Sequence, residues 1–153
     1  MKILHLDSNH AILTEKLKQA GFENYFDFTS SKEDIMPLIK NYEGLIVRSR
    51  FPIDKEFLKM ATSLKFIGRV GAGLENIDVA FAKAQGISCY NAPEGNRNAV
   101  GEHALGMLLS IFNHLNRADK EVRSGLWRRE ENRGIELEGK TVGLIGYGHM
   151  GKA

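Results

Sequence analysis

Through residues 1–92, short apolar runs alternate with stretches in which apolar residues recur every three or four positions. The runs are typical of buried strands, and the wider spacing is typical of helices that bury one face. In the first such stretch, Ile12, Leu13 and Leu17 fall on one helical face. The pattern predicts five strands, at 2–6, 22–28, 44–49, 64–70 and 87–90, and four helices, at 11–21, 30–40, 54–63 and 78–86.

The stretch at 30–40 carries signals for both a helix start and a helix break. It opens with serine followed by acidic residues, a combination typical of a capped helix N-terminus. Pro37 falls inside the pattern, and a proline lacks the N–H that a helix interior requires. We therefore expect this helix to be bent or to start late.

Strands that alternate with helices of about ten residues predict an α/β fold, with a parallel sheet and helices on both faces. Five strands before residue 92 are typical of a flavodoxin-like domain. Ligands of such sheets bind beyond the carboxyl ends of the strands. Three segments are candidates on this ground, because they follow strands directly: Arg48–Arg50, Gly71–Gly73 and Asn91–Asn96.

From Asn98 to about Ser124 the chain contains no proline, and its apolar residues keep a helical spacing. This pattern predicts one long amphipathic helix. The helix is longer than the packing of one small domain requires, so we expect it to bridge domains or subunits. A polar, irregular stretch with Trp127 follows it. The apolar positions are Val100, Ala104, Met107, Leu108, Ile111, Phe112, Leu115, Ala118 and Val122.

The last residues, TVGLIGYGHMGKA, predict the start of a second unit. Thr141–Ile145 has the pattern of a buried strand, and a G-x-G-x-x-G sequence follows at Gly146, Gly148 and Gly151. In a dinucleotide site the first glycine permits a tight turn, the second lets the backbone approach a pyrophosphate, and the third allows close packing. An acidic residue about 20 positions further on would support this interpretation, and the chain ends before that position.

Composition mainly excludes classes of function. The 21 basic and 19 acidic residues are interspersed and leave a net charge of +2, which does not favour nucleic-acid binding. Cys89, the single cysteine, lies among apolar residues, which favours a buried structural role over a reactive thiol. No metal-ligand spacing occurs among the histidines and Cys89. With no secretory signal and no membrane-spanning run, we expect a cytoplasmic protein.

Arg48, Ser49 and Arg50 follow an apolar strand, at the point where a core gives way to a cleft. A guanidinium there could bind a carboxylate or a phosphate through two hydrogen bonds. A surface arginine paired with a nearby acid explains the same pattern equally well.

The sequence GAG at 71–73 also follows a strand. Its main-chain N–H groups could face an anion. A plain turn is at least as good an explanation. The pattern offers no acidic or nucleophilic partner to three further histidines, so we expect no catalytic histidine among His103, His114 and His149.

Several blocks, taken in order, resemble the D-isomer-specific 2-hydroxyacid dehydrogenases. They are GLIVRSR, the run from FIGRVGAGLENID to GEHALGML, RSGLWRR and LEGKTVGLIGYGHMGKA. The resemblance covers residues 40–153 well and residues 1–39 loosely. Within the family, the blocks look most like the phosphoglycerate-oxidising members.

Members of this family are longer than this chain, and their substrate domain is discontinuous in sequence. The resemblance implies that residues 1–96 form the first part of that domain, 97–135 a linking and dimerisation helix with an arm, and 136–153 the start of a Rossmann NAD-binding domain. It also implies a homodimer, or an oligomer built from it, through residues 100–130. The family's catalytic arginine, glutamate and histidine would lie outside this chain, which alone should be inactive.

The resemblance assigns roles to individual residues. Arg48–Arg50 match the motif that holds the acidic groups of the substrate, and the second arginine favours a doubly anionic substrate. Gly71 and Gly73 match the loop that faces the substrate, with Ala72 toward the nicotinamide, and Asn96 matches an asparagine on the substrate side. The residues that match the NAD pyrophosphate site are Gly146, Gly148, His149, Met150 and Gly151.

For the whole enzyme, the resemblance implies reversible hydride transfer between NAD and C2 of a small anionic 2-hydroxy acid. The nicotinamide performs the chemistry and the protein orients it. Two alternatives stay open. One is a glyoxylate or hydroxypyruvate reductase of the same family, and the other is a non-catalytic NAD-sensing protein related to the corepressors of this fold. We expect no nucleic-acid or membrane partner.

Overall fold

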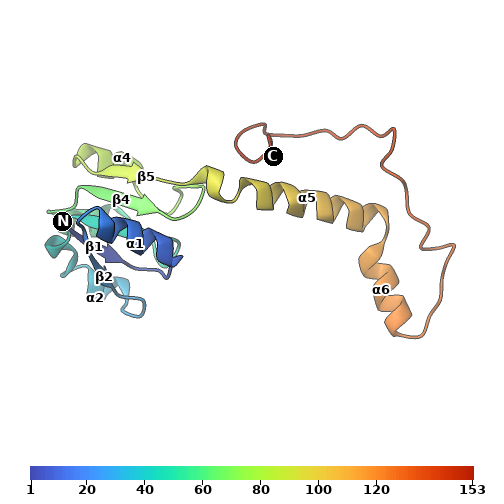
Figure 1. Cartoon of the computed structure of the whole chain (residues 1–153), viewed down its shortest axis with the longest axis horizontal. Helices are drawn as coiled ribbons and strands as arrows, with labels where there is room; N and C mark the ends of the chain where they lie inside the picture. The colour runs from blue at the N-terminus through green and yellow to red at the C-terminus, as the bar shows by residue number, and fades with distance from the viewer. The chain divides into compact units, whose positions relative to one another are not determined.

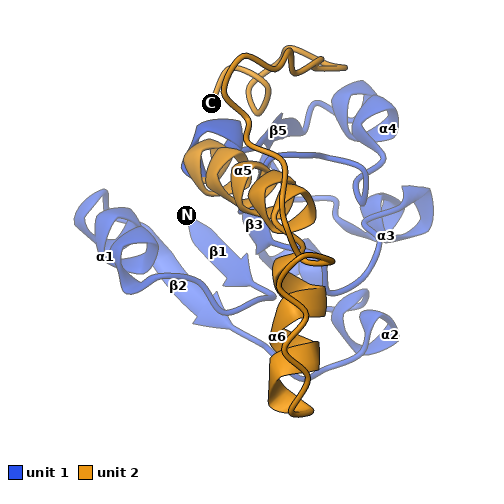
Figure 2. Cartoon of the chain, turned by 90° about the vertical axis from the view of Figure 1, so that its right-hand side faces the viewer, with its two compact units in different colours: residues 1–95 blue, residues 96–153 orange.

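The computed structural model describes all 153 residues. Its contacts divide the chain into two compact units, residues 1–95 and 96–153 (Figure 2). The division lies one residue from the boundary expected between the substrate domain and the linking helix. The functions assigned to the two parts stay predictions.

The first unit is built on a five-stranded parallel sheet, which confirms the expected α/β class. Its strands are β1 (Lys2–His5), β2 (Glu23–Phe26), β3 (Gly44–Val47), β4 (Phe66–Arg69) and β5 (Ser88–Tyr90). Their order is β2-β1-β3-β4-β5 (Figure 1). The chain steps outward to β2, crosses back to β3 and continues to β5, as in a flavodoxin-like sheet.

Short helices connect these strands. They are α1 (Ala11–Gln19), α2 (Lys32–Ile35), α3 (Lys55–Met60) and α4 (Val79–Ala84), with 3-10 turns η1 (Ile39–Asn41) and η2 (Pro93–Gly95). Figure 2 shows α1 on one side of the sheet and α2, α3 and α4 on the other. This division follows from right-handed crossovers, since the chain reverses its direction along the sheet after β2.

Side chains at the helix N-termini explain where three of the helices begin. Ser31, Asp54 and Asp78 each accept a hydrogen bond from a backbone N–H three residues further on. Ser31 also forms a reciprocal capping box with Asp34. The helix expected over 30–40 is shorter than predicted, because α2 ends before Pro37, which cannot continue the helical hydrogen bonding.

The main core lies on the face of the sheet that carries α2, α3 and α4. Leu45, Val47 and Ile67 point into it from the strands, and Phe57 from α3, all at 0% exposure. Burying side chains of this size contributes roughly 1.5–3 kcal/mol each. This face therefore supplies most of the stability of the first unit.

The face toward α1 is packed differently. His5 and Ile46 are buried on it, but glycines stand beside them. A Cβ atom at Gly44 would lie 2.5 Å from the ring of Phe66, and one at Gly68 would lie 2.9 Å from Ile46 Cδ1. The glycines thus allow large neighbouring side chains to lie flat against the sheet.

The second unit contains two helices where the sequence predicts one. These are α5 (Arg97–Phe112) and α6 (Leu115–Arg123). His114 between them is left-handed, with φ of 52°. The prediction of a continuous helix is therefore wrong, and a contact from outside the helix accompanies the break. The Phe112 carbonyl accepts a hydrogen bond from the N–H of Ile135 at 3.0 Å instead of a helical partner.

The two helices also differ in where their apolar residues lie. On α6 they form the expected stripe, at Leu115, Ala118 and Val122. On α5 they cover more than half of the circumference, since Leu105 and Leu109 lie far round from Val100. No residue of either helix is buried. No helix of the structure has both the length and the apolar content of a membrane span.

Residues 136–153 contain no strand, so the strand predicted at Thr141–Ile145 is not formed. Leu144 and Ile145 are exposed instead. A parallel strand needs a neighbour to pair its backbone groups, and the second unit offers none. The glycine turn is formed, because Gly146 has φ of +90° and the Lys152 N–H bonds to the Gly148 carbonyl at 3.2 Å.

Candidate functional site

The parallel sheet brings the segments that follow β3, β4 and β5 to one edge. The N–H of Val70 donates to the carbonyl of Val47, and the N–H of Ala92 donates to that of Gly71, both at 2.9 Å. The predicted segments 48–50 and 71–73 therefore lie side by side, and Ala92 of the third predicted segment lies beside the 71–73 loop. All three segments are candidates because they follow parallel strands whose carboxyl ends lie at this edge.

The main chain of Arg48 is fixed on both sides. Its N–H donates to the carboxylate of Asp7 at 2.6 Å, and its carbonyl accepts from Arg69 Nε at 3.2 Å and Asn76 Nδ2 at 3.1 Å. The side chains of Arg48 and Ser49 are exposed and form no hydrogen bond or ion pair. A free guanidinium on a fixed backbone is suited to anion binding, because only the side chain remains to be ordered when the anion binds.

The side chain of Arg50 points elsewhere. Its Nη1 donates to the carbonyls of Leu6 and Asp27, at 3.0 and 2.5 Å, and its Nη2 donates to the carbonyl of Ser30. These bonds use three of the five N–H donors of the guanidinium, and the predicted substrate contact by Arg50 stays a prediction. Within the motif, only Arg48 and Ser49 present free polar side chains.

The glycine loop keeps free donors. The N–H groups of Ala72 and Gly73 donate to no other group, while the Ala72 carbonyl accepts from Asn91 Nδ2 at 2.5 Å. A Cβ atom at Gly71 would collide with the guanidinium of Arg69, so glycine is needed there for that side chain to fold over the loop. Free N–H groups beside a cation support anion binding more than a plain turn.

Arg69, the last residue of β4, was missed by the sequence reasoning. Its guanidinium lies over Gly71, its Nε donates to the Arg48 carbonyl, and it has no acidic partner. Two unpaired positive charges therefore stand at neighbouring strand ends. A signal was available, because Arg69 follows the apolar FIG just as Arg48 follows LIV.

Cys89 packs against the main core and is partly buried. Burial raises the pKa of its thiol, so the thiolate form is disfavoured. This environment supports the structural role expected for it.

Asn96 and the glycine-rich turn belong to the second unit. Asn96 is the N-cap residue of α5, yet its side chain makes no capping hydrogen bond. Its amide is thus not used in starting the helix.

The turn at 146–151 fits a dinucleotide phosphate. Gly146 has a positive φ, Gly148 has open space where a Cβ would stand, and a Cβ at Gly151 would collide with the Gly146 carbonyl. These are the conditions for close approach of a pyrophosphate to the backbone at the start of a helical turn. His149 and Met150 lie within this turn, so the residues present are compatible with a nicotinamide dinucleotide.

The chain is similar to a family of known proteins over most of its length. The family model for the catalytic domain of D-isomer specific 2-hydroxyacid dehydrogenases matches residues 3–147. A D-3-phosphoglycerate dehydrogenase of Archaeoglobus fulgidus is 36% identical over 151 residues, which are 99% of this chain and 29% of the relative. A hydroxypyruvate reductase of Thermotoga maritima is 38% identical over 121 residues, which are 79% of this chain and 40% of the relative.

A solved structure is similar over almost the whole chain. It is the NADPH-dependent glyoxylate/hydroxypyruvate reductase of Sinorhizobium meliloti in complex with NADP and malonate. Its TM-score is 0.77 at 27% identity, over 99% of this chain and 47% of that one. This chain spans less than half the length of each of these three proteins. From the match over residues 3–147, the chain belongs to the D-isomer specific 2-hydroxyacid dehydrogenase family.

Proposed function

We propose that the chain is the N-terminal portion of an NAD-dependent D-3-phosphoglycerate dehydrogenase, which oxidises 3-phosphoglycerate to 3-phosphohydroxypyruvate in serine biosynthesis. The observation that carries the proposal is the pair of unpaired arginines, Arg48 and Arg69, beside the free N–H groups of Ala72 and Gly73. A substrate with a carboxylate and a phosphate calls for two separate cationic partners. The similarity to the Archaeoglobus fulgidus enzyme supports this choice.

In this reaction the bound NAD accepts a hydride from C2 of the substrate. The residues of this chain bind and orient. Arg48 pairs with an anionic group, Ser49 and the 71–73 loop add neutral donors, and Asn96 contributes its amide on the substrate side. Each charge-assisted hydrogen bond is worth about 1.5–3 kcal/mol. Together these contacts hold C2 within reach of the nicotinamide.

The resemblance assigns two sets of residues to the cofactor. Ala72 faces the nicotinamide end. The pyrophosphate lies against the main chain of the glycine-rich turn, at Gly146, Gly148, His149, Met150 and Gly151. One solved relative is NADPH-dependent. The choice of NAD over NADP therefore belongs to the proposal.

A hydroxypyruvate or glyoxylate reductase is the second candidate. One observation favours it: Arg50 donates to main-chain carbonyls, which leaves one free arginine in the 48–50 motif. A single cation there suits a singly charged 2-oxo acid. The Thermotoga maritima relative carries this activity in its name.

We also propose a homodimer, or an oligomer built from it, through residues 100–130. Trp127 is 80% exposed and Ile111 is 70% exposed, and the arginines at 128 and 129 flank the tryptophan. Tryptophan and arginine are enriched at interface centres. One patch is enough, because a two-fold axis uses it twice. A cytoplasmic location likewise stays a prediction.

Turnover assays on the protein encoded by the whole reading frame test the proposal. NADH formation from 3-phosphoglycerate should exceed, in kcat/KM, the reaction with glycerate, and the 153-residue chain alone should form no NADH. Arg48→Ala should lower kcat/KM by about 10- to 100-fold, the equivalent of one charged contact, and leave NAD affinity unchanged. Preference for hydroxypyruvate over its phosphorylated form would select the second candidate.

A further inference from the structure

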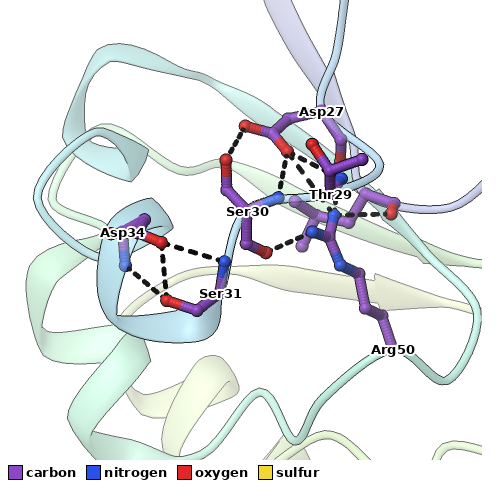
Figure 3. Close-up of polar contacts among 7 residues, drawn as sticks. Asp27, Thr29, Ser30, Ser31, Asp34 and Arg50 are labelled. Carbon is purple, nitrogen blue, oxygen red and sulfur yellow. Dashed lines mark hydrogen bonds and ion pairs between the residues drawn. The ribbon is translucent and has the colours of Figure 1, made fainter.

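The guanidinium of Arg50 joins three segments that are distant in sequence. It donates to carbonyls at the ends of β1 and β2, those of Leu6 and Asp27, and to the carbonyl of Ser30 before α2 (Figure 3). The side chain is only 15% exposed. Carbonyls at strand ends have no further partner in the sheet, so Arg50 satisfies groups that would otherwise be left unpaired.

The loop that receives Arg50 is itself ordered by Asp27. Its carboxylate accepts from the N–H groups of Thr29 and Ser30, at 3.2 and 2.9 Å, and from the Ser30 hydroxyl at 2.7 Å (Figure 3). Oδ1 also lies 3.7 Å from Arg50 Nη1. These bonds, led by those from Ser30 and helped by the charge of Arg50, hold the pKa of Asp27 below its usual value. Both the carbonyl and the carboxylate of Asp27 therefore face Arg50.

A second contact between the segments after β1 and β3 lies beside the Arg50 contact. Leu6 is bonded by the side chain of Arg50, and the next residue, Asp7, accepts the N–H of Arg48 at 2.6 Å. The two bonds connect Leu6 and Asp7, which follow β1, to residues 48–50, which follow β3. Moving Arg50 would loosen one of the two ties that fix the backbone from which Arg48 and Ser49 project.

We propose that Arg50 is a positioning residue, which holds the exit of β3 against the ends of β1 and β2 so that Arg48 and Ser49 face the ligand, and which does not itself touch the ligand. The inference rests on the proposed function, because that ligand is the anionic substrate. The three bonds use both N–H groups of Nη1 and one N–H group of Nη2, so an anion that bound this end of the guanidinium would have to displace main-chain carbonyls in a partly buried site.

Lysine substitution separates a positioning role from a direct one. Lysine keeps the charge but not the planar fork of donors that reaches three carbonyls. In the 153-residue chain, Arg50→Lys should lower the melting temperature by about 5 °C or more. Hydrogen exchange at the amides of Thr29 and Ser30 should speed up by roughly tenfold. The matched control, Arg48→Lys, should change neither. A wild-type melting temperature in Arg50→Lys would overturn the proposal.

A double-mutant cycle tests whether Arg50 acts through Arg48. Binding of 3-phosphoglycerate is followed by NMR titration of the wild type, Arg48→Ala, Arg50→Lys and the double variant. Arg50→Lys should weaken binding by roughly fivefold in the wild type and have almost no effect beside Arg48→Ala. Losses that add would mean direct contact. An unchanged affinity in the single variant would mean that Arg50 positions nothing, and either result refutes the inference.

Inorganic phosphate serves as a second probe in the same cycle. Binding of phosphate without binding of 3-phosphoglycerate would count against the proposed function, while the cycle with phosphate still decides the role of Arg50. If the wild type binds neither probe, Arg48 has no anion to face and the positioning inference fails with the site.

Discussion

The two units of the chain differ in what they bury. Every fully buried hydrophobic residue lies in residues 1–95, and no residue of 96–153 is buried. Both units are rich in apolar residues, so composition does not explain the difference. In the first, each crossover returns a helix to the sheet and covers it. In the second, α5 is apolar round most of its surface, and no sheet stands within the unit to receive it.

The two units are therefore suited to different roles. A self-contained core can hold strand ends rigidly, as the fixed main chain of Arg48 illustrates. An uncovered apolar helix is suited to association instead, with a second copy or with other parts of a longer chain. Four expected outcomes test this division, taken from the largest effect to the smallest.

A pair of leucine substitutions measures the difference directly. Leu45→Ala should lower the unfolding free energy by about 2–5 kcal/mol, because Leu45 is 0% exposed and its removal leaves a cavity. Leu105→Ala should cost less than about 0.5 kcal/mol, since Leu105 is 54% exposed. Urea unfolding followed by circular dichroism gives both values. Equal losses would show that α5 is covered in solution.

The oligomeric state tests whether a second copy of the chain packs against the apolar surface of α5. Light scattering should find dimers of the wild-type protein at micromolar concentration. Replacing both Leu108 and Phe112 with aspartate should give monomers, because each carboxylate buried at an interface costs about 1–3 kcal/mol or more. Gln19→Glu together with Gln85→Glu adds the same two negative charges at exposed positions outside residues 100–130 and should leave the dimer intact. A wild-type monomer would remove the dimer proposal and favour cover from within a longer chain.

The sequence predicts the first unit better than the second, for a physical reason. Its five strands follow from local periodicity, since each apolar run is buried by its own neighbours. At the break between α5 and α6, the Phe112 carbonyl accepts a hydrogen bond from the Ile135 N–H, a contact that no local pattern records. The strand expected at 141–145 requires a partner strand. Local signals succeed where the partners lie nearby in the sequence.

The candidate site shows the same limit. Arg48 and the 71–73 loop could be found from their places after strands. The hydrogen bonds of Arg50 could not be found in this way, because its three acceptors come from the ends of β1 and β2 and from the loop before α2. Arg69 was missed for a different reason: it ends a strand instead of following one, so a search for motifs in loops passes over it.

Helix caps provide a smaller test of the comparison. Asp78→Ala should cost about 1 kcal/mol, since Asp78 accepts the Phe81 N–H at 2.9 Å at the start of α4. Asn96→Ala should cost only a few tenths, because Asn96 makes no capping bond to α5. Thermal unfolding measures both. If Asn96→Ala nevertheless weakens substrate binding in the longer enzyme, its amide serves the ligand, whereas a large stability loss would assign it to the helix.

The smallest expected effect concerns His5, the one buried polar residue, at 1% exposure on the interior strand β1. Its Nε2 lies 2.8 Å from Asn24 Oδ1, and its ring lies 5.0 Å from that of Phe26. An amide oxygen can only accept, so Nε2 carries the proton of the neutral ring. Burial lowers the pKa of His5, and the hydrogen bond to Asn24 opposes that shift only in part.

The sign of the resulting pH dependence follows from linkage. The unfolded chain binds a proton at His5 near the ordinary pKa of about 6.5, while the folded chain resists protonation until lower pH. Stability is therefore fully present above about pH 6.5 and is lost as the pH falls toward the lowered folded pKa. Asp27, Glu43 and Asp54, whose pKa values are also lowered, reduce the free energy of unfolding only below about pH 4.

Urea unfolding between about pH 7.5 and about pH 5 should thus show that the free energy of unfolding declines in the wild type, and that the decline is shallower in His5→Leu. Parallel curves would mean that the ring is protonated as readily in the folded unit as in water, and that this face of the sheet is more open than its packing indicates.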